Sequence, residues 1–440
     1  MPDSKYFMKK AESAQWKIFI GPVEIAGIAG GLVSGFSKLG IYAEANFSCP
    51  YPFQSIPVVS HWIFNVWQLL GAARARTSKS NLVHKVALVL LHNTWGWLIF
   101  IRSLPRFNAF FFLGGQTITN SNLELWFLKC LRKKIIFIYT GSDSRPPYID
   151  GGRFPVSSSR PSAKYLNTLT KRCKKKLGLH EKFADYLVNS PATAQFHKRH
   201  YINWFALGIP KLINSSNFYD KKPQDSVRIV HSPSSPGVKG TSVIIAALDR
   251  LRDKGFLIDW INIQGKPNSV VLDELSRCDF VVDQLYSDTP LATFATEAAF
   301  FGKPAVVGGY FASDVSSTIS ADEIPPSLFV LPELIESAIE RMIVDDSFRF
   351  ELGQKAKQFV ESTWTVELVA GRYLKLLENE IPDHWWCNPK DVSYVGGCGM
   401  PLSHAQLLIS DLIKKFGVSA LQVSDKPELE QALLSLASEI

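Results

Sequence analysis

A serine-rich loop with one lysine is the segment of this sequence best suited to bind an anion. It covers 231–241 (His-Ser-Pro-Ser-Ser-Pro-Gly-Val-Lys-Gly-Thr) and lies between a predicted strand and a predicted helix. Backbone N–H groups at a helix start attract phosphate, and the ammonium group of Lys239 would offset the phosphate charge. The loop lacks the spacing of a nucleotide-hydrolysing P-loop, so it predicts a phosphate site of another kind.

Two carboxylates have positions from which they could act on a substrate. Glu297 lies near the start of a predicted helix that is followed by Gly-Lys-Pro at 302–304. There it could accept hydrogen bonds from two ribose hydroxyls, or it could be an exposed helix residue. Asp143 directly follows a predicted strand, where α/β sheets place functional groups. It either orients a substrate or caps the turn before Pro146.

Apolar runs that alternate with helical patterns predict an α/β fold built from parallel strands. Strands are expected at 16–21, 109–113, 134–139 and 186–189, and again at 227–230, 258–263, 280–283 and 305–307. A chain of 440 residues is longer than one hydrophobic core usually supports. We therefore predict two Rossmann-like domains that face a central cleft.

A stretch near 210–226 is rich in Pro, Asn, Ser and Lys and predicts a linker between the domains. The predicted limits are 1–215 for the first domain, 216–382 for the second, and 383–440 for a C-terminal extension of unknown role. The extension could be an added subdomain or a dimerisation element.

The two halves of the chain carry opposite net charges. Residues 1–220 hold 28 Lys and Arg against 10 Asp and Glu, a net charge of +18, whereas residues 221–440 have a net charge of −10. The basic half favours an anionic partner such as acidic lipid headgroups or a phosphate-bearing acceptor, or the halves attract each other across the cleft. The basic cluster at 171–176 has no interleaved aromatic residues, which argues against nucleic-acid binding.

The segment 60–102 combines apolar and aromatic residues with several cations. Its most apolar part, 86–101, is too short and too polar to be predicted to span a membrane, since it contains His92 and Asn93. A helical hairpin that lies on a membrane surface and a helix pair in the core of the first domain both fit the pattern. Six scattered cysteines without a CxxC pair argue against disulfides and zinc, and no secretory signal is recognised. These features favour the cytoplasm, with peripheral contact to an anionic membrane.

Several of these motifs together resemble glycosyltransferase family 4. They are Lys239-Gly240, the Glu-Ala-x-x-x-Gly-Lys-Pro run at 297–304, and the strand–loop–helix start around Gly30 and Gly31. The resemblance implies a GT-B fold and retaining transfer of a sugar from a nucleotide-sugar, a UDP-sugar, without a metal or resident cofactor. The segments 140–145 and 189–191 are similar to parts of bacterial surface-polysaccharide transferases, which implies a lipid-linked or polysaccharide acceptor bound by the first domain.

Carried over position by position, the resemblance assigns the donor diphosphate to the 232–240 segment, with Lys239 as the catalytic cation. Ser232, Ser234 and Gly240 belong to this segment. Glu297 would bind the ribose.

Two further groups complete the predicted site. Gly30 and Gly31 would approach the transferred sugar or the phosphate. Asp143 and Asp288 would be catalytic, Asp143 by orienting the sugar or the acceptor, and Thr289 would bind the donor.

The sequence departs from the family pattern at two places. Ser234 stands where an arginine is common, and Thr289 stands where the family has a second acid, with Asp288 one residue earlier. These departures keep open a catalytically silent relative that acts as a binding or scaffold subunit. A nucleotide-sugar 2-epimerase of the same fold is the other alternative.

Overall fold

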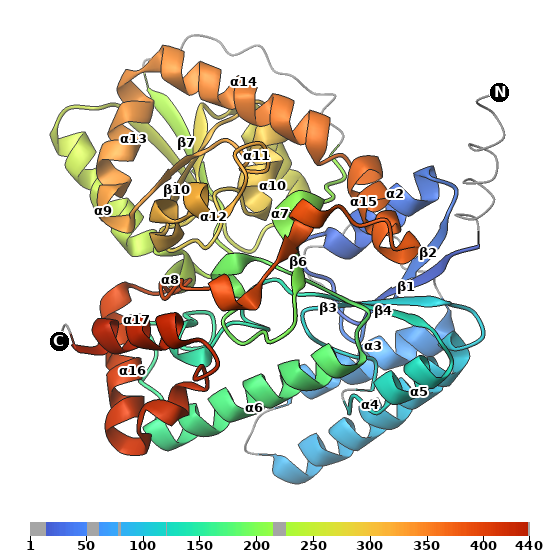
Figure 1. Ribbon diagram of the computed structural model, residues 1–440. Coiled ribbons are helices and arrows are strands. Elements are labelled where there is room, and N and C mark those ends of the chain that lie inside the picture. The colour runs from blue at the N-terminus through green and yellow to red at the C-terminus, as the bar shows by residue number, and fades with distance from the viewer. Residues whose placement is uncertain (1–14, 51–60, 78–80, 120, 214–225, 439–440) are drawn as a thin grey trace.

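The structure is a computed structural model that describes residues 15–50, 61–77, 81–119, 121–213 and 226–438. It contains two separate sheets, one of seven strands and one of five. Figure 1 shows the sheets in two layered units, one above the other, each with helices on both faces. The predicted α/β fold with two parallel sheets is confirmed.

The first sheet has the order β12-β6-β5-β4-β3-β1-β2, and its strands are parallel except for β12, which runs antiparallel to β6. The strands are β1 (Lys17–Gly21), β2 (Tyr42–Ala45), β3 (Ala109–Leu113), β4 (Lys134–Ile138), β5 (Tyr186–Asn189), β6 (Tyr201–Asn203) and β12 (Trp386–Cys387). The interior strand β3, between β4 and β1, reads Ala-Phe-Phe-Phe-Leu and is buried at every residue. A parallel strand covered on both faces requires such an unbroken apolar run.

Two layers of helices cover this sheet. On one face α2 packs against α15 and the sheet, and on the other face α3 to α6 enclose the larger core. The helices are α2 (Ile28–Lys38), α3 (Trp62–Arg76), α4 (Leu82–Ser103), α5 (Glu124–Cys130), α6 (Ala163–Phe183) and α7 (Trp204–Leu207). The predicted helical hairpin at 60–102 is therefore present as α3 and α4. By length and composition α4 could cross a membrane, and 33% of its apolar window is buried inside the protein.

The second sheet is parallel throughout, in the order β11-β10-β9-β7-β8. Its strands are β7 (Val227–His231), β8 (Ile258–Asn262), β9 (Phe280–Val282), β10 (Ala305–Gly308) and β11 (Leu328–Val330). Its helices are α8 (Pro236–Lys239), α9 (Thr241–Asp253), α10 (Asn268–Arg277), α11 (Thr293–Phe300), α12 (Val315–Thr318), α13 (Ile335–Val344) and α14 (Asp346–Thr363). The carboxyl ends of these strands lie at the cleft, which places the 231–241 loop there.

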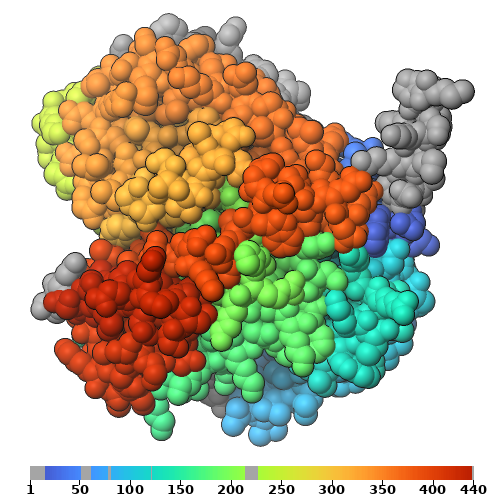
Figure 2. All heavy atoms as spheres, viewed as in Figure 1, coloured from blue at the N-terminus to red at the C-terminus, as the bar shows by residue number. Residues whose placement is uncertain are grey.

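The end of the chain returns to the first sheet. Helix α15 (Val366–Glu378) packs on α2, and β12 adds an edge strand beside β6. Helices α16 (Leu402–Phe416) and α17 (Pro427–Ser438) then pack beside α6, where Tyr148 donates a hydrogen bond to the carbonyl of Leu421 at 3.0 Å. In Figure 2 this last segment forms the dark red corner of the molecule. The C-terminal extension thus completes the core of the first unit.

Candidate functional site

A cavity of about 610 Å³ opens between the two units, at the carboxyl ends of β7 and β8. It takes its walls from the start of α2, Lys211 and Leu212 at the start of the linker, the 231–241 loop, the loop after β8, and the start of α11. Its lining includes Ala26, Gly27, Lys211, Ser232, Ser234, Lys239, Gln264, Gly265, Lys266, Thr293, Phe294 and Glu297. Three of these residues are cations, and Glu297 is the one carboxylate among the described lining residues. The cavity is therefore suited to an anionic ligand.

Lys239 is held in place at the floor of this cavity. Its ammonium lies 3.1 Å from the Asp283 carboxylate at the end of β9, and that carboxylate side chain is fully buried. The chain then turns through Gly240 with φ +70°, where a Cβ would lie 2.6 Å from the Leu285 side chain. Glycine is needed there because both the backbone conformation and the close approach exclude a side chain. This packing fixes the lysine.

Helix α11 begins at the same cavity with its first N–H groups free of a side-chain cap. Ala292, Thr293 and Phe294 form this helix end and line the cavity. One turn further, Glu297 is buried and pairs with Lys211 at 2.9 Å. Free helix-start amides beside two cations form an anion site by general electrostatics.

The start of α2, which also lies at the cleft, is already satisfied by an internal carboxylate. Glu24 accepts hydrogen bonds from the backbone N–H groups of Ile25 at 2.8 Å, Ala29 at 3.2 Å and Gly30 at 3.2 Å. Burial raises the pKa of Glu24, although these N–H bonds and Lys211 oppose the rise. This helix start therefore offers its amides to Glu24.

Gly30 and Gly31 lie inside α2, buried, and line neither of the cavities described here. A Cβ on Gly31 would lie 2.0 Å from the carbonyl oxygen of Pro210, so this glycine allows the linker to pack on the helix. Asp143 is likewise occupied by backbone groups. It accepts N–H bonds from Thr140 at 3.1 Å and Gly141 at 2.9 Å, which is the turn-capping arrangement.

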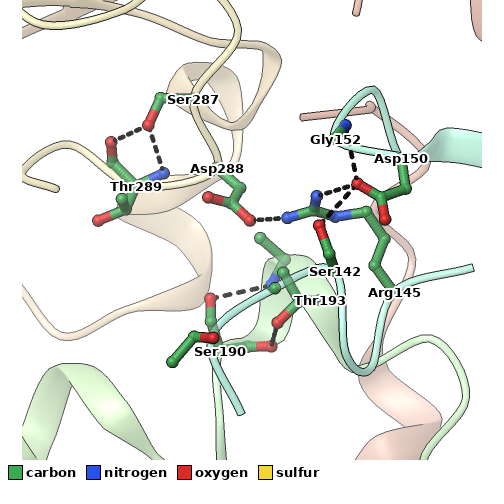
Figure 3. A network of polar contacts seen from close by, with 12 residues as sticks. Ser142, Arg145, Asp150, Gly152, Ser190, Thr193, Ser287, Asp288 and Thr289 are labelled. Atoms are coloured by element: carbon green, nitrogen blue, oxygen red, sulfur yellow. Dashed lines mark hydrogen bonds and ion pairs between the residues drawn. The ribbon is translucent and has the colours of Figure 1, made fainter. Parts of the chain in front are cut away.

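Asp288 forms part of a polar network that joins the two units (Figure 3). It pairs with Arg145, whose side chain is 2% exposed and also lies 3.5 Å from the buried Asp150. Ser142 and the N–H of Gly152 donate further bonds to Asp150. Asp288 therefore connects the second sheet to the first through a buried cation.

A second cavity, of about 250 Å³, adjoins this network. Asp288 and Thr289 line it from the second unit, and Thr140 and Ser190 line it from the first. The two cavities share four lining residues, namely Ala26, Lys239, Ala292 and Thr293. A ligand that fills the larger cavity would thus reach the smaller one beside Lys239.

His231, the first residue of the 231–241 loop, is a buried structural residue. One ring nitrogen, Nδ1, lies 2.7 Å from the carbonyl of Val282, and the other, Nε2, lies 2.8 Å from the Thr241 hydroxyl. Burial lowers the pKa of His231 from 6.5 to about 4. The neutral imidazole therefore ties β7 to β9 and to the start of α9.

This histidine predicts a pH dependence of stability. The unfolded chain binds a proton on His231 below pH 6.5, whereas the folded chain does so only near pH 4. Stability is therefore lost as the pH falls from 6.5 to 4, by about 3 kcal/mol from this residue. We expect the melting temperature of His231→Gln to fall less steeply than that of the wild type over this range. Equal slopes for the wild type and the His231→Gln variant would contradict the prediction.

Sequence reasoning missed Lys211 and the loop after β8. Lys211 lies in the predicted linker, and its ammonium donates to the Ala26 carbonyl at 2.6 Å and to Glu297. No local pattern marks a linker lysine as part of a site. The loop with Gln264 and Lys266 did carry a signal, because it follows a predicted strand of the parallel sheet. Among the described residues no group of three or more His, Cys, Asp or Glu is arranged to hold a metal ion.

Several solved structures are similar to this chain. The catalytic domain of starch synthase IV from Arabidopsis thaliana, bound to ADP and acarbose, has a TM-score of 0.51 and 10% identity, and the match covers 83% of this chain and 99% of that one. The chain has the GT-B fold. HepE of Anabaena with UDP-glucose also matches this GT-B chain, at a TM-score of 0.47 and 13% identity over 83% of this chain and all of that one. No family model and no curated protein matches the GT-B chain by sequence.

Proposed function

We propose that the protein is a retaining glycosyltransferase of the hexosyltransferase type that uses a UDP-sugar as donor. The acceptor in this proposal is a lipid-linked oligosaccharide or a polysaccharide of the cell surface. The observation that carries the proposal is the 610 Å³ cavity, where the open start of α11, Lys239 and the Glu297–Lys211 pair meet. The ADP bound to the starch synthase with this fold supports a nucleotide at the cleft.

The cavity suggests a position for each part of the donor. The diphosphate would lie against the α11 amides and Lys239, and Ser232 and Ser234 line the wall beside it. Glu297 would accept hydrogen bonds from the ribose hydroxyls in place of its pair with Lys211. Lys211 is then released toward the diphosphate, and so supplies the second cation that Ser234 does not provide.

In the proposed reaction the protein must stabilise the diphosphate leaving group. The bond between the sugar C1 and the diphosphate oxygen breaks with its electron pair on the diphosphate, and the acceptor hydroxyl oxygen bonds to C1 on the same face. The acceptor proton passes to the departing phosphate oxygen. A fixed ammonium and helix-start amides stabilise the growing charge more in the transition state than in the ground state, so no metal is invoked.

The acceptor would approach from the first unit. The smaller cavity joins the donor cavity at Lys239 and Thr293, so the transferred sugar would lie at their junction, near Asp288 and Thr289. The basic first half of the chain suits a phosphate-bearing, lipid-linked acceptor. We place the enzyme in the cytoplasm, at the cytoplasmic face of the inner membrane.

If the donor binds as proposed, Glu297→Gln should weaken nucleotide binding selectively. In a thermal-shift titration with UDP, GDP and ADP and their sugars, the wild type should be stabilised by one nucleotide, expected to be UDP. The variant should bind it about 10-fold to 100-fold more weakly, because a charge-assisted hydrogen bond to the ribose is lost. Glu351→Gln, an exposed residue of α14, serves as the control and should bind like the wild type.

The outcomes separate this proposal from its alternatives. If no nucleotide shifts the melting temperature of the folded wild type, the donor site is refuted. A shift without sugar transfer to any acceptor extract would indicate a silent binding subunit. Conversion of UDP-N-acetylglucosamine to its 2-epimer would indicate an epimerase, which needs acids free in the cleft. Among the residues that the structure describes, the two carboxylates that line the cavities, Glu297 and Asp288, are each paired with a cation.

A further inference from the structure

The outer face of α4 is apolar, although it faces solvent. The inner face packs into the main core through Ile99 and Phe100, and Leu88 is also buried there. On the outer face Val83 is 83% exposed and Leu90 is 62% exposed. A helix on a water-exposed surface normally carries polar residues there. The outer face of α4 is thus suited to contact an apolar environment other than the protein core.

Neighbouring helices extend this apolar surface. Phe127 of α5 packs against Trp97 and Phe100 of α4, with ring centroids 6.1 Å and 6.4 Å apart, so α4 and α5 share one surface. We call it the α3–α4–α5 face. Its exposed apolar residues are Trp62, Leu69, Leu82, Val83, Val86, Leu90, Leu91, Leu98, Ile101, Leu123, Trp126, Phe127 and Leu131. So many exposed apolar side chains on adjacent helices mark an interaction site.

The charged side chains of α3 and α4 are all cations. Helix α5 adds the buried Glu124, which bonds to Thr119, and Lys129, which pairs with Asp185. Residues 45–123 contain six Lys and Arg but no Asp or Glu. Arg76 is exposed at the end of α3, and α6, which contacts α5, exposes Lys171, Arg172 and Lys175. A second copy of this face would bring like charges together, since a two-fold interface pairs each patch with itself. An anionic partner is favoured instead.

We propose that the α3–α4–α5 face docks on the surface of an anionic phospholipid membrane. Helix α4 lies parallel to the membrane plane with its outer leucines at the boundary between headgroups and acyl chains. Trp62 and Trp126 lie at headgroup depth, where tryptophan is enriched. Helix α4 does not cross the membrane, because Ile99 and Phe100 belong to the protein core. In Figures 1 and 2 α3 and α4 lie at the end of the molecule remote from the second sheet. The inference is independent of the donor site.

Co-sedimentation of the full chain with lipid vesicles tests the proposal. One set of vesicles contains phosphatidylcholine alone, and the other mixes it with phosphatidylglycerol. The wild type should sediment with the mixed vesicles. The double variant Leu90→Glu, Leu91→Glu should bind at least about tenfold more weakly, since charged groups are placed in the acyl boundary. The control Phe350→Glu alters an equally exposed apolar residue on α14 of the other unit and should bind like the wild type.

A charge variant tests the choice of lipid. Arg76→Gln with Lys85→Gln should weaken binding to the mixed vesicles by about fivefold for each cation removed. Binding to phosphatidylcholine alone should change little, because that surface has no net charge.

Three outcomes would overturn the proposal. The wild type could fail to sediment with either vesicle, or the Leu90, Leu91 variant could bind as well as the wild type. A wild-type dimer that this variant converts to a monomer, without vesicle binding, would assign the face to a second copy. Nucleotide thermal shifts on the same samples keep the two proposals separate. Vesicle binding without a nucleotide shift refutes the donor site alone, and the reverse result refutes the docking alone.

Discussion

Lys239→Ala is expected to lower the rate of sugar transfer by about 100-fold to 1,000-fold, the usual cost of removing one preorganised group that stabilises developing charge. The ammonium group is fixed by Asp283 at the floor of the donor cavity. Its interaction grows as the diphosphate gains charge, so kcat should fall more than the affinity for the donor. Steady-state kinetics with the donor identified by thermal shift would measure both quantities.

Two controls separate this catalytic role from a structural one. Removing the lysine leaves the Asp283 carboxylate buried without its cation, so the melting temperature of each variant must be measured alongside its kinetics. Lys254→Ala removes an exposed lysine that pairs with Glu340 on the outer surface, and it should keep wild-type rates. A stable Lys239→Ala protein with wild-type kcat would rule out the assigned role.

Arg145→Met is expected to destabilise the protein by about 3 kcal/mol, near the lower limit for breaking a buried ion pair. The guanidinium links Asp288 in the second unit to Asp150 in the first, as Figure 3 shows. The loss stays near the lower limit because Arg153 still pairs with Asp150 at 3.1 Å. Urea unfolding followed by tryptophan fluorescence would measure the change.

Asp288→Asn should destabilise the protein less than Arg145→Met does. The Asp288 side chain is 16% exposed, and Asp150 remains as a partner of Arg145. It should loosen the contact between the units, which small-angle X-ray scattering would detect as a larger radius of gyration. Asp411→Asn breaks an exposed pair with Arg160 and provides a matched control with little expected effect. If Arg145→Met unfolds like the wild type, the buried network does not stabilise the protein.

The fold followed from the sequence wherever burial leaves a local pattern. Buried parallel strands read as apolar runs, so the prediction of a strand at 109–113 matches β3. The strand β2 was missed because Tyr-Ala-Glu-Ala is short and half polar. The pairing of β12 with β6 joins residues about 185 positions apart, and local periodicity does not encode such a contact.

The candidate site likewise contains residues that the sequence predicted and residues that it did not. Ser232, Ser234, Lys239 and Glu297 lie together because each follows or begins an element at the carboxyl edge of one parallel sheet. The assignments of these residues to donor groups stay predictions. Lys211 reaches the site only through the packing of the linker on α2, which depends on tertiary contacts that no short motif records.

The return of the chain to its first sheet has a consequence for synthesis. During translation the second sheet is contiguous in sequence, from β7 to β11, and can form as soon as its residues leave the ribosome. The first sheet is completed only when α15 and β12 have been made, and its largest core also includes residues of α16 and α17. Nascent chains arrested before residue 366 therefore expose Leu32 and Phe36, which later pack against α15, and these chains should recruit chaperones. The half of the molecule that is made first is thus the half that is completed last.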